Sequence, residues 1–307
     1  MITTTSGPLE ARYFDRMDAA LGDKQRLIKW LPERARAVAD MGAGSGALAA
    51  SIVRRTGASV YALDSNPDAV SRMRDDVRGI SDHVTVIRGD FESLRVMGTA
   101  APFDAVVCSS VLHEVYSYGA SDDIRRYAAW SAAIDSAVRS VRSGGRFIIR
   151  DGVAPRDPLR RARITPLTSE DATLLERYLD ALPKVSSRRL RRVGDGYEHT
   201  ARAVAEALFT LNWLDADASP EQFARETSET YQLADLDRYA RRVMNISDAA
   251  GAPLRLVHSE EYIQPEYVEH LKPRFQTSLA SLESDPRHSE LEPWLPSTNA
   301  IWVFERE

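Results

Sequence analysis

Residues 38–46 join a short apolar run to a turn with three alternate glycines, Gly42, Gly44 and Gly46. Helical spacing begins directly afterwards, at Ala47. Glycine allows backbone angles that other residues avoid, and it lets the chain approach a ligand closely. A strand that runs into such a turn and then into a helix is typical of open α/β sheets, which bind ligands at the carboxyl ends of their strands. The turn therefore predicts both a fold class and the place of a ligand.

The residues on either side of this turn alternate between short apolar runs and helical patterns. Strands are predicted at residues 37–41, 59–63, 84–87, 103–108 and 146–149. Helices are predicted at residues 47–55, 67–78 and 122–141. The second of these helices begins at Pro67, with Asn66 as its N-cap. Such units of strand, helix and strand give a parallel sheet with helices packed on it.

The pattern changes after Asp151. Four helix-like stretches follow without a convincing strand, at residues 169–182, 199–211, 220–229 and 233–250. Strand character returns at residues 253–263 and 299–304. We therefore predict a doubly wound, mostly parallel seven-stranded sheet whose last strand is antiparallel. The sheet domain comprises residues 1–151 and 252–307, and residues 152–251 form a helical insertion between strands five and six that caps the substrate site.

Acidic residues accompany each of the first three predicted strands. Asp40 lies two residues before the first glycine, Asp64 ends the second strand, and Asp90 follows the third strand together with Phe91. A carboxylate at Asp64 is placed to accept hydrogen bonds from ribose hydroxyls. Asp90 and Phe91 are placed to contact the amino group and the face of an adenine. A carboxylate at position 40 repels a pyrophosphate but attracts an ammonium group, so a nucleoside without phosphates is favoured.

The order acid-x-Gly-x-Gly-x-Gly from Asp40 to Gly46 resembles the first motif of the class I S-adenosylmethionine-dependent methyltransferases. The likeness extends to Gly144 and Gly145, before the fifth strand. It implies S-adenosylmethionine as the cofactor. The residues that it places at the cofactor are Asp40, Gly42, Gly44, Gly46, Asp64, Ser65, Asp90, Phe91 and Ser109. Tyr13 and Phe14 are placed either to close over the cofactor or to pack in the core. A nicotinamide enzyme is a distant alternative, because the glycines also fit the looser dinucleotide pattern.

His113 follows the fourth predicted strand, at the edge where open α/β sheets bind their ligands. An imidazole that titrates near neutral pH suits the removal of a proton from a hydroxyl or an amine. We therefore predict that His113 is the general base and that its neighbour Glu114 orients it. The alternatives are that His113 packs locally near the cofactor and that Glu114 faces water.

The residues after the fourth strand also narrow the class of methyl acceptor. Methyltransferases of exocyclic base amines or glutamine side chains typically carry an Asn-Pro-Pro-Tyr-like motif there, whereas residues 109–112 read Ser-Ser-Val-Leu. The acidic cluster of the magnesium-dependent catechol enzymes is not found either, so we expect no metal ion. The segment 112–114 is similar to that of enzymes that methylate an O, N or C atom of a small molecule, and a role in secondary metabolism is consistent with it.

Two other functions remain open on the sequence. Arg188, Arg189, Arg191 and Arg192 form a basic run that suits an RNA-modifying methyltransferase, although such a run is also typical of a solvated helix face or loop. The net charge of -5 gives no general attraction to nucleic acid. A protein that binds S-adenosylmethionine without catalysis is the other alternative.

The composition sets the expected compartment. No apolar run approaches the roughly 20 residues that span a bilayer, and residues 1–8 lack the basic and apolar regions of a secretion signal. The only cysteine, Cys108, lies in an apolar run and is expected to pack as a small hydrophobic residue. We expect a cytoplasmic protein with a small-molecule partner and no membrane contact. The methyl acceptor, the methylated atom and the oligomeric state are left open by the sequence.

Overall fold

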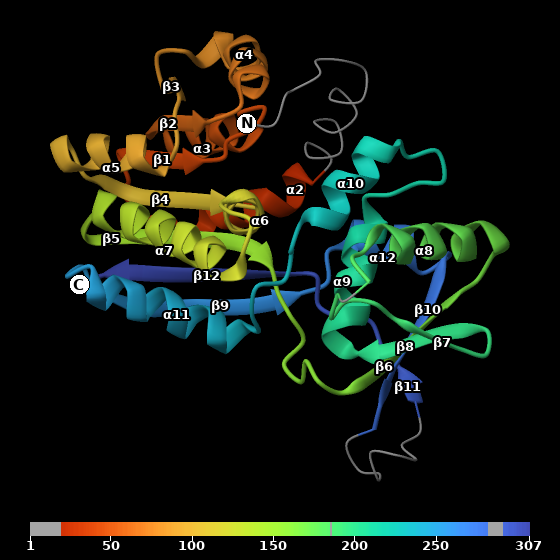
Figure 1. Ribbon diagram of the computed structural model, residues 1–307. Helices are drawn as coiled ribbons and strands as arrows, with labels where there is room; N and C mark the ends of the chain where they lie inside the picture. The colour runs from red at the N-terminus through yellow and green to blue at the C-terminus, as the bar shows by residue number, and fades with distance from the viewer. Residues whose placement is uncertain (1–19, 185, 282–290) are drawn as a thin grey trace.

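Seven strands form one sheet in the order β3-β2-β1-β4-β5-β12-β9, in a computed structural model that describes residues 20–184, 186–281 and 291–307 (Figure 1). The strands are β1 (Ala37–Met41), β2 (Ser59–Asp64), β3 (Val84–Arg88), β4 (Phe103–Ser109), β5 (Val141–Gly152), β9 (Leu254–Tyr262) and β12 (Asn299–Arg306). The strands β1 to β5 run parallel to one another, whereas β12 is antiparallel to both of its neighbours, β5 and β9. The predicted sheet, mostly parallel with an antiparallel last strand, is confirmed.

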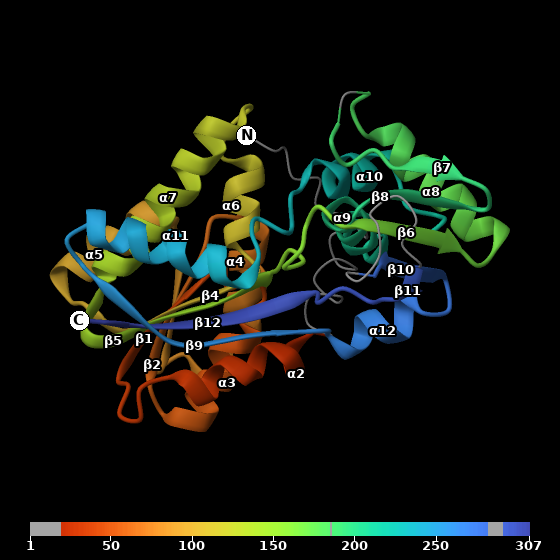
Figure 2. The ribbon, with the colours of Figure 1, turned by 90° about the horizontal axis from the view of Figure 1, so that it is seen from below.

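Helices cover both faces of this sheet, as Figure 2 shows. On one face lie α5 (Phe91–Ala100), α6 (Leu112–Tyr118), α7 (Asp123–Ser140) and α11 (Leu236–Ala249). On the other face lie α2 (Leu21–Lys24), η1 (Gln25–Trp30), α3 (Ala47–Thr56) and α4 (Pro67–Asp76), and η2 (Arg78–Ile80) follows α4. Burial of the strands on both faces explains why they read as short, nearly continuous apolar runs. None of the helices that the structure describes has the length and apolar character needed to span a bilayer.

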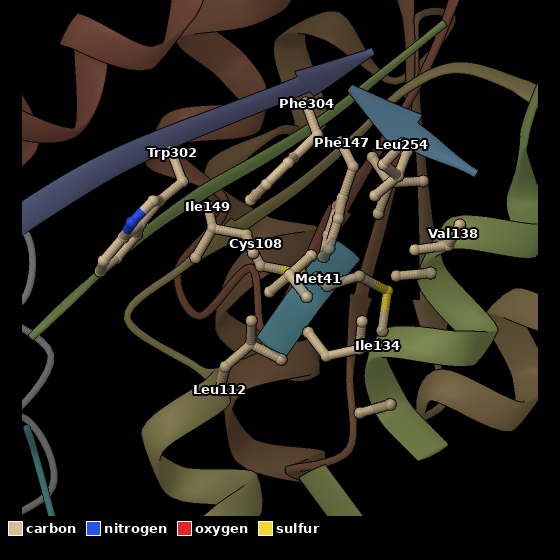
Figure 3. Close-up of a cluster of buried hydrophobic side chains, with 14 of the residues drawn as sticks. Met41, Cys108, Leu112, Ile134, Val138, Phe147, Ile149, Leu254, Trp302 and Phe304 are labelled. Carbon is tan, nitrogen blue, oxygen red and sulfur yellow. The ribbon is translucent and has the colours of Figure 1, made fainter. Parts of the chain in front are cut away.

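The core between the sheet and α7 is built from aromatic and aliphatic side chains of β5 and β12 (Figure 3). Trp302 of β12 is fully buried, and its indole nitrogen donates a hydrogen bond to the carbonyl oxygen of Leu236 at 2.9 Å. The ring of Tyr239 stacks on Trp302 with 4.2 Å between the centroids. These contacts fix α11 against the sheet. The helix therefore belongs to the sheet lobe, although it lies within the predicted insertion.

A second lobe contains a five-stranded antiparallel sheet in the order β11-β10-β6-β8-β7. Its strands are β6 (Arg161–Pro166), β7 (Arg191–Val193), β8 (Gly196–Thr200), β10 (Phe275–Ala280) and β11 (Leu291–Pro293). Its helices are α8 (Ser169–Ala181), α9 (Ala201–Asn212), α10 (Pro220–Ser228) and α12 (Pro265–Leu271). The helices share one apolar core with β6, which contributes Ala162 and Ile164.

The prediction of an all-helical insertion is wrong in two respects. Residues 152–251 contain three strands, and the segment that carries α12, β10 and β11 adds to the same lobe after β9 has left the main sheet. The strands escaped the sequence pattern because they are short and bury one face only. In β6, for example, Arg161 and Arg163 are partly exposed on either side of buried Ala162. A strand of this kind carries too few apolar residues to be distinguished from a loop.

Candidate active site

The glycine turn after β1 is strained for any residue other than glycine. Gly42, Gly44 and Gly46 have φ angles of 67°, 57° and 80°. A Cβ atom on Gly42 would lie 2.5 Å from Cγ2 of Val111, and one on Gly46 would lie 2.6 Å from Cγ of Met73. Conformation and space therefore both require glycine at these two positions. The backbone nitrogens of Gly42 and Ala43 donate to the carbonyl oxygen of Leu63, which fixes the turn at the carboxyl end of β1, where the sequence predicted the cofactor.

A small cavity beside the turn is lined by Lys24, Asp40, Ser45 and Ser109, among other residues. Asp40 is 1% exposed, and its Oδ2 atom accepts no hydrogen bond from the described residues. Burial raises the pKa of Asp40 to about 7, although the positive charge of Lys24 opposes this shift. The hydroxyl oxygen of Ser109 likewise has no partner among the described residues. Buried polar atoms without partners are rare and suggest a ligand. Tyr13 and Phe14 lie outside the described residues.

Asp64 links the end of β2 to the glycine turn. Its Oδ2 accepts a hydrogen bond from the backbone nitrogen of Gly44 at 2.9 Å, and its Oδ1 accepts one from Asn66 at 2.9 Å. Burial raises the pKa of Asp64, and the backbone hydrogen bonds from Asn66, Gly44 and Ser65 oppose the shift. Each carboxylate oxygen has a second lone pair, so the predicted contact of Asp64 with ribose hydroxyls is compatible with this geometry. The role of Ser65, which is exposed beside it, stays a prediction.

Asp90 is exposed and caps the start of α5. Its Oδ1 accepts hydrogen bonds from the backbone nitrogen and the hydroxyl of Ser93, both at 3.0 Å. The backbone hydrogen bond from Ser93 is the main reason why the pKa of Asp90 lies below its usual value. Phe91 is partly buried against the core. Asp90 thus has a structural role at the helix start, and the adenine contact of both residues stays a prediction.

His113, at the start of α6, is buried between two carboxylates. Its Nδ1 lies 2.6 Å from Oδ1 of Asp151, and its backbone nitrogen donates to Oδ2 of the same residue at 3.0 Å. Its Nε2 lies 3.7 Å from Oε2 of Glu229. Burial by itself lowers the pKa of His113, but the charge and hydrogen bond of Asp151, with the charges of Glu229 and Glu114, raise it to about 10. The hydrogen bonds that orient His113 come from Asp151, whereas Glu114 acts on it through its charge.

A larger cavity lies in front of His113, where the two lobes meet. The sheet lobe contributes the ends of β4 and β5 and the start of α6, and the second lobe contributes α9, α10 and α12 (Figure 1). The lining includes Lys24, Ser110, His113, Glu114, Arg150, Asp151, Phe209, Trp213, Glu226, Glu229, Tyr231, Gln264, Glu266, His270 and Asn299. Lys24 lines both cavities, and Ser110 follows Ser109 directly. The cavity at the glycine turn and the cavity at His113 therefore adjoin.

A buried ion pair, which sequence reasoning missed, lies at the larger cavity, and its arginine belongs to the lining. Arg150 of β5 is 2% exposed and pairs with Asp23 of α2, with 2.7 Å from Nε to Oδ2. Its other nitrogens donate to Gln264 at 2.9 Å and to the hydroxyl of Ser110 at 2.6 Å. Ser110 has a φ angle of 58°, which is unusual for a residue other than glycine. The arginine thus holds together the strand ends on which the site is built.

The arginine run of residues 188–192 serves mainly the second lobe itself. Arg188 donates to the carbonyl oxygen of Glu229 at 2.8 Å and lies 3.7 Å from the buried carboxylate of Glu206. Arg189 donates to the carbonyl oxygen of Leu179 at 2.8 Å. Arg188 therefore anchors the segment that carries Glu229 to the wall of the larger cavity. These contacts favour a structural role of the run over a nucleic-acid surface.

Comparison with known proteins identifies the domain around the glycine turn. Residues 38–145 match a family model described as a methyltransferase domain. No curated protein matches the chain in sequence. An O-methyltransferase family protein from Burkholderia thailandensis has a similar structure, with 13% identity over 97% of this chain and 59% of that protein and a TM-score of 0.50. An O-methyltransferase family 2 protein from Planctomyces limnophilus, solved with apigenin, has 12% identity over 96% of this chain and 61% of that protein and a TM-score of 0.51.

The order of the seven strands, the glycine turn after β1 and the match to the family model agree on one fold. The chain has the class I methyltransferase fold. Residues 38–145 match a methyltransferase domain, and this match agrees with the S-adenosylmethionine-dependent class and the cofactor that the motifs predicted. The chain spans less than two thirds of the length of either similar structure, and at such low identity the likeness shows the fold alone.

Proposed function

We propose that the protein transfers the methyl group of S-adenosylmethionine to an O, N or C nucleophile of a small molecule without a metal ion. The observation that carries this proposal is the buried pair of His113 and Asp151, which faces a cavity next to the glycine turn. A proton acceptor beside a methyl donor is the arrangement that methyl transfer to a protonated nucleophile needs. The match of residues 38–145 to a methyltransferase domain supports the reaction class.

The charged and polar residues around the small cavity match the amino-acid end of S-adenosylmethionine in their chemistry. That end carries an ammonium and a carboxylate, and Asp40 and Lys24 offer the opposite charges side by side. The unpartnered Oδ2 of Asp40 and hydroxyl of Ser109 supply hydrogen-bonding atoms. Asp64 and Asp90, with Phe91, would hold the nucleoside. When bound, the cofactor supplies an electrophilic methyl group on a sulfonium, and the protein mainly positions the nucleophile.

His113 would accept the proton of the nucleophile at Nε2. Asp151 holds the proton on Nδ1, so the neutral form of His113 presents the lone pair of Nε2 toward the cavity. Because the pKa of His113 lies near 10, His113 is protonated in most of the molecules at neutral pH. Below this pKa, the neutral fraction increases about tenfold with each unit by which the pH rises. Turnover is therefore expected to rise with pH, and replacement of His113 by Gln should remove the rise.

Calorimetric titration with S-adenosylmethionine, S-adenosylhomocysteine and NADH tests the proposal at its base. We expect binding of the two sulfur nucleosides and none of NADH. The variant Asp40→Asn keeps the shape of the side chain and should weaken both interactions, whereas Asp76→Asn, on the exposed face of α4, should leave them unchanged. Binding of NADH alone, or of none of the three compounds, would refute the assignment.

Release of S-adenosylhomocysteine in the presence of small hydroxy and amino compounds then tests catalysis. We expect at least one such acceptor to support turnover, and we expect His113→Gln to slow it by about 10² to 10⁴ while cofactor binding is kept. An equal loss of cofactor binding in that variant would move His113 into the cofactor pocket. Cofactor binding without turnover on any acceptor would instead favour a protein that binds S-adenosylmethionine without catalysis.

A further inference from the structure

The lining of the larger cavity is unusually rich in carboxylates. The acidic residues among those that line it are Glu114, Asp151, Glu226, Glu229 and Glu266. Among the described residues, the permanently charged bases of the lining are Lys24 and Arg150, and the titratable bases are His113 and His270. Acids and bases must be matched in pairs before the excess charge says anything about a ligand.

Three of these bases already have acidic partners. Arg150 is held by Asp23, which does not line the cavity, and its five-donor fork is also used by Ser110, Gln264 and the hydroxyl of Tyr262. Lys24 acts on the carboxylate of Asp40 in the adjoining cavity. His113 is paired with Asp151 at 2.6 Å. The positive charges that could bind an anionic acceptor are therefore already paired with other groups of the protein.

Of the three carboxylates that line the cavity from the second lobe, Glu266 is exposed, whereas Glu229 and Glu226 are buried. Their side chains are 7% and 3% exposed. Glu229 accepts a hydrogen bond from the neutral hydroxyl of Tyr118 at 2.5 Å, and Glu226 accepts one from that of Tyr231. Burial is the main cause that raises the pKa of Glu229 to about 7, and the charge of Glu226 adds to it. Arg225 pairs with Glu226 at 2.6 Å, and Nε2 of His113 lies 3.7 Å from Glu229, whereas no lysine or arginine side chain of the described residues pairs with Glu229. A cation at this place would relieve the repulsion between the two acids.

The rest of the wall suits an aromatic ring and hydrogen-bond donors. Phe209 and Tyr231 stack on each other with 4.8 Å between their centroids, and Trp213 also lines the cavity. Aromatic faces attract cations as well as flat rings. Asn299 is 3% exposed, and its side-chain oxygen accepts no hydrogen bond from the described residues. This buried acceptor is available to a donor on the ligand, whereas the two carboxylates already accept hydrogen bonds from Tyr118 and Tyr231 and offer negative charge.

We propose that the methyl acceptor is a small arylalkylamine, an alkyl amine that carries an aromatic ring, and that it binds as its ammonium ion. The charged nitrogen lies at Glu226 and Glu229, and the ring lies against Phe209 and Tyr231. The proposal rests on the proposed function, because it takes the cavity in front of His113 as the acceptor site. It narrows the class of methyl acceptor from small molecules in general to cations.

Three probes of one shape and different charge test the proposal. They are tyramine, which is a cation at pH 7.5, the neutral 4-ethylphenol, and the anionic 3-(4-hydroxyphenyl)propionate. Each is titrated calorimetrically into protein saturated with S-adenosylhomocysteine, so that the result needs no turnover. We expect tyramine to bind at least about tenfold more tightly than 4-ethylphenol, which corresponds to about 1.4 kcal/mol, and the propionate to bind most weakly. Equal or tighter binding of the neutral or the anionic probe, or binding of none of the three, overturns the proposal.

Matched variants locate the effect. Glu229→Gln and Glu226→Gln should each remove most of the preference for tyramine while 4-ethylphenol binds as before. Glu176→Gln, at an exposed carboxylate of α8 outside the cavity, should leave the preference unchanged. A preference that survives in both cavity variants would contradict the assignment. The affinity for S-adenosylhomocysteine, measured first in each protein, separates the two proposals: its absence refutes the proposed function, whereas its presence without a preference for the cation refutes only this inference.

Discussion

The two cavities of this protein are built in different ways. The small cavity, which we propose for the cofactor, is lined mainly by one stretch that runs from Asp40 at the end of β1 through the glycine turn into α3, and Lys24 and Ser109 complete it. The larger cavity, which we propose for the acceptor, is formed by side chains from both lobes, and Glu229 belongs to the segment that connects α10 to α11. The first depends on backbone conformation and the second on long-range pairing of charges. This difference suggests that the cofactor site and the acceptor site can be disrupted separately.

The buried ion pair of Arg150 and Asp23 should be the most sensitive position. Arg150→Met removes the buried partner of Asp23 and leaves it only the hydroxyl of Tyr262 and the partly exposed Arg26, so we expect the free energy of unfolding to fall by about 3–5 kcal/mol. Urea denaturation followed by circular dichroism measures this loss. The double variant Asp23→Leu with Arg150→Met removes both charges and should recover most of it. If the double variant were no more stable than the single one, the loss of stability would not come from the unpaired charge of Asp23.

The glycine turn should respond next, and more locally. Gly42→Ala places a methyl group 2.5 Å from Val111 at a φ angle of 67°, so we expect a loss of about 1–3 kcal/mol in stability and a larger relative loss of S-adenosylhomocysteine affinity. Gly79→Ala is the matched control, because a Cβ atom there meets nothing within 4 Å. Thermal unfolding and calorimetry on both variants give the comparison. Normal cofactor affinity in Gly42→Ala would show that the turn does not contact the cofactor.

The glycine turn and the surroundings of His113 differ in how much of each could be predicted from the sequence. The turn and the strands around it were predicted because their signals are local: a few apolar residues, then glycines, then helical spacing. Asp151 and Glu229 were not, because their role exists only once distant segments pack around His113. One signal was available, since Arg150 and Asp151 place two adjacent charges directly after the buried apolar residues 147–149. Charges at such a position require buried partners, and a sequence alone does not show which ones.

The titration of His113 sharpens the comparison at the acceptor site. The charge of Asp151 raises the pKa of His113, so Asp151→Asn should lower the midpoint of its titration from about 10 by more than about one unit. The neutral imidazole would then be populated at lower pH, and any rise of turnover with pH should move in the same direction. Nuclear magnetic resonance of the imidazole nitrogens measures the midpoint without an acceptor. An unchanged midpoint would mean that Asp151 positions His113 without acting on its charge.

The smallest effects should divide the arginine run into two parts. Arg188 holds the backbone that carries Glu229, so Arg188→Gln should lower the free energy of unfolding by about 1.5 kcal/mol and also weaken binding of tyramine. Arg192 pairs at 3.5 Å with Glu176 on the surface, where both side chains are more than half exposed. Arg192→Gln should therefore change stability by no more than about 0.5 kcal/mol. Equal, small effects of both substitutions, together with salt-sensitive RNA binding that both of them weaken, would return the run to the role of a nucleic-acid surface and would leave Glu229 without its anchor.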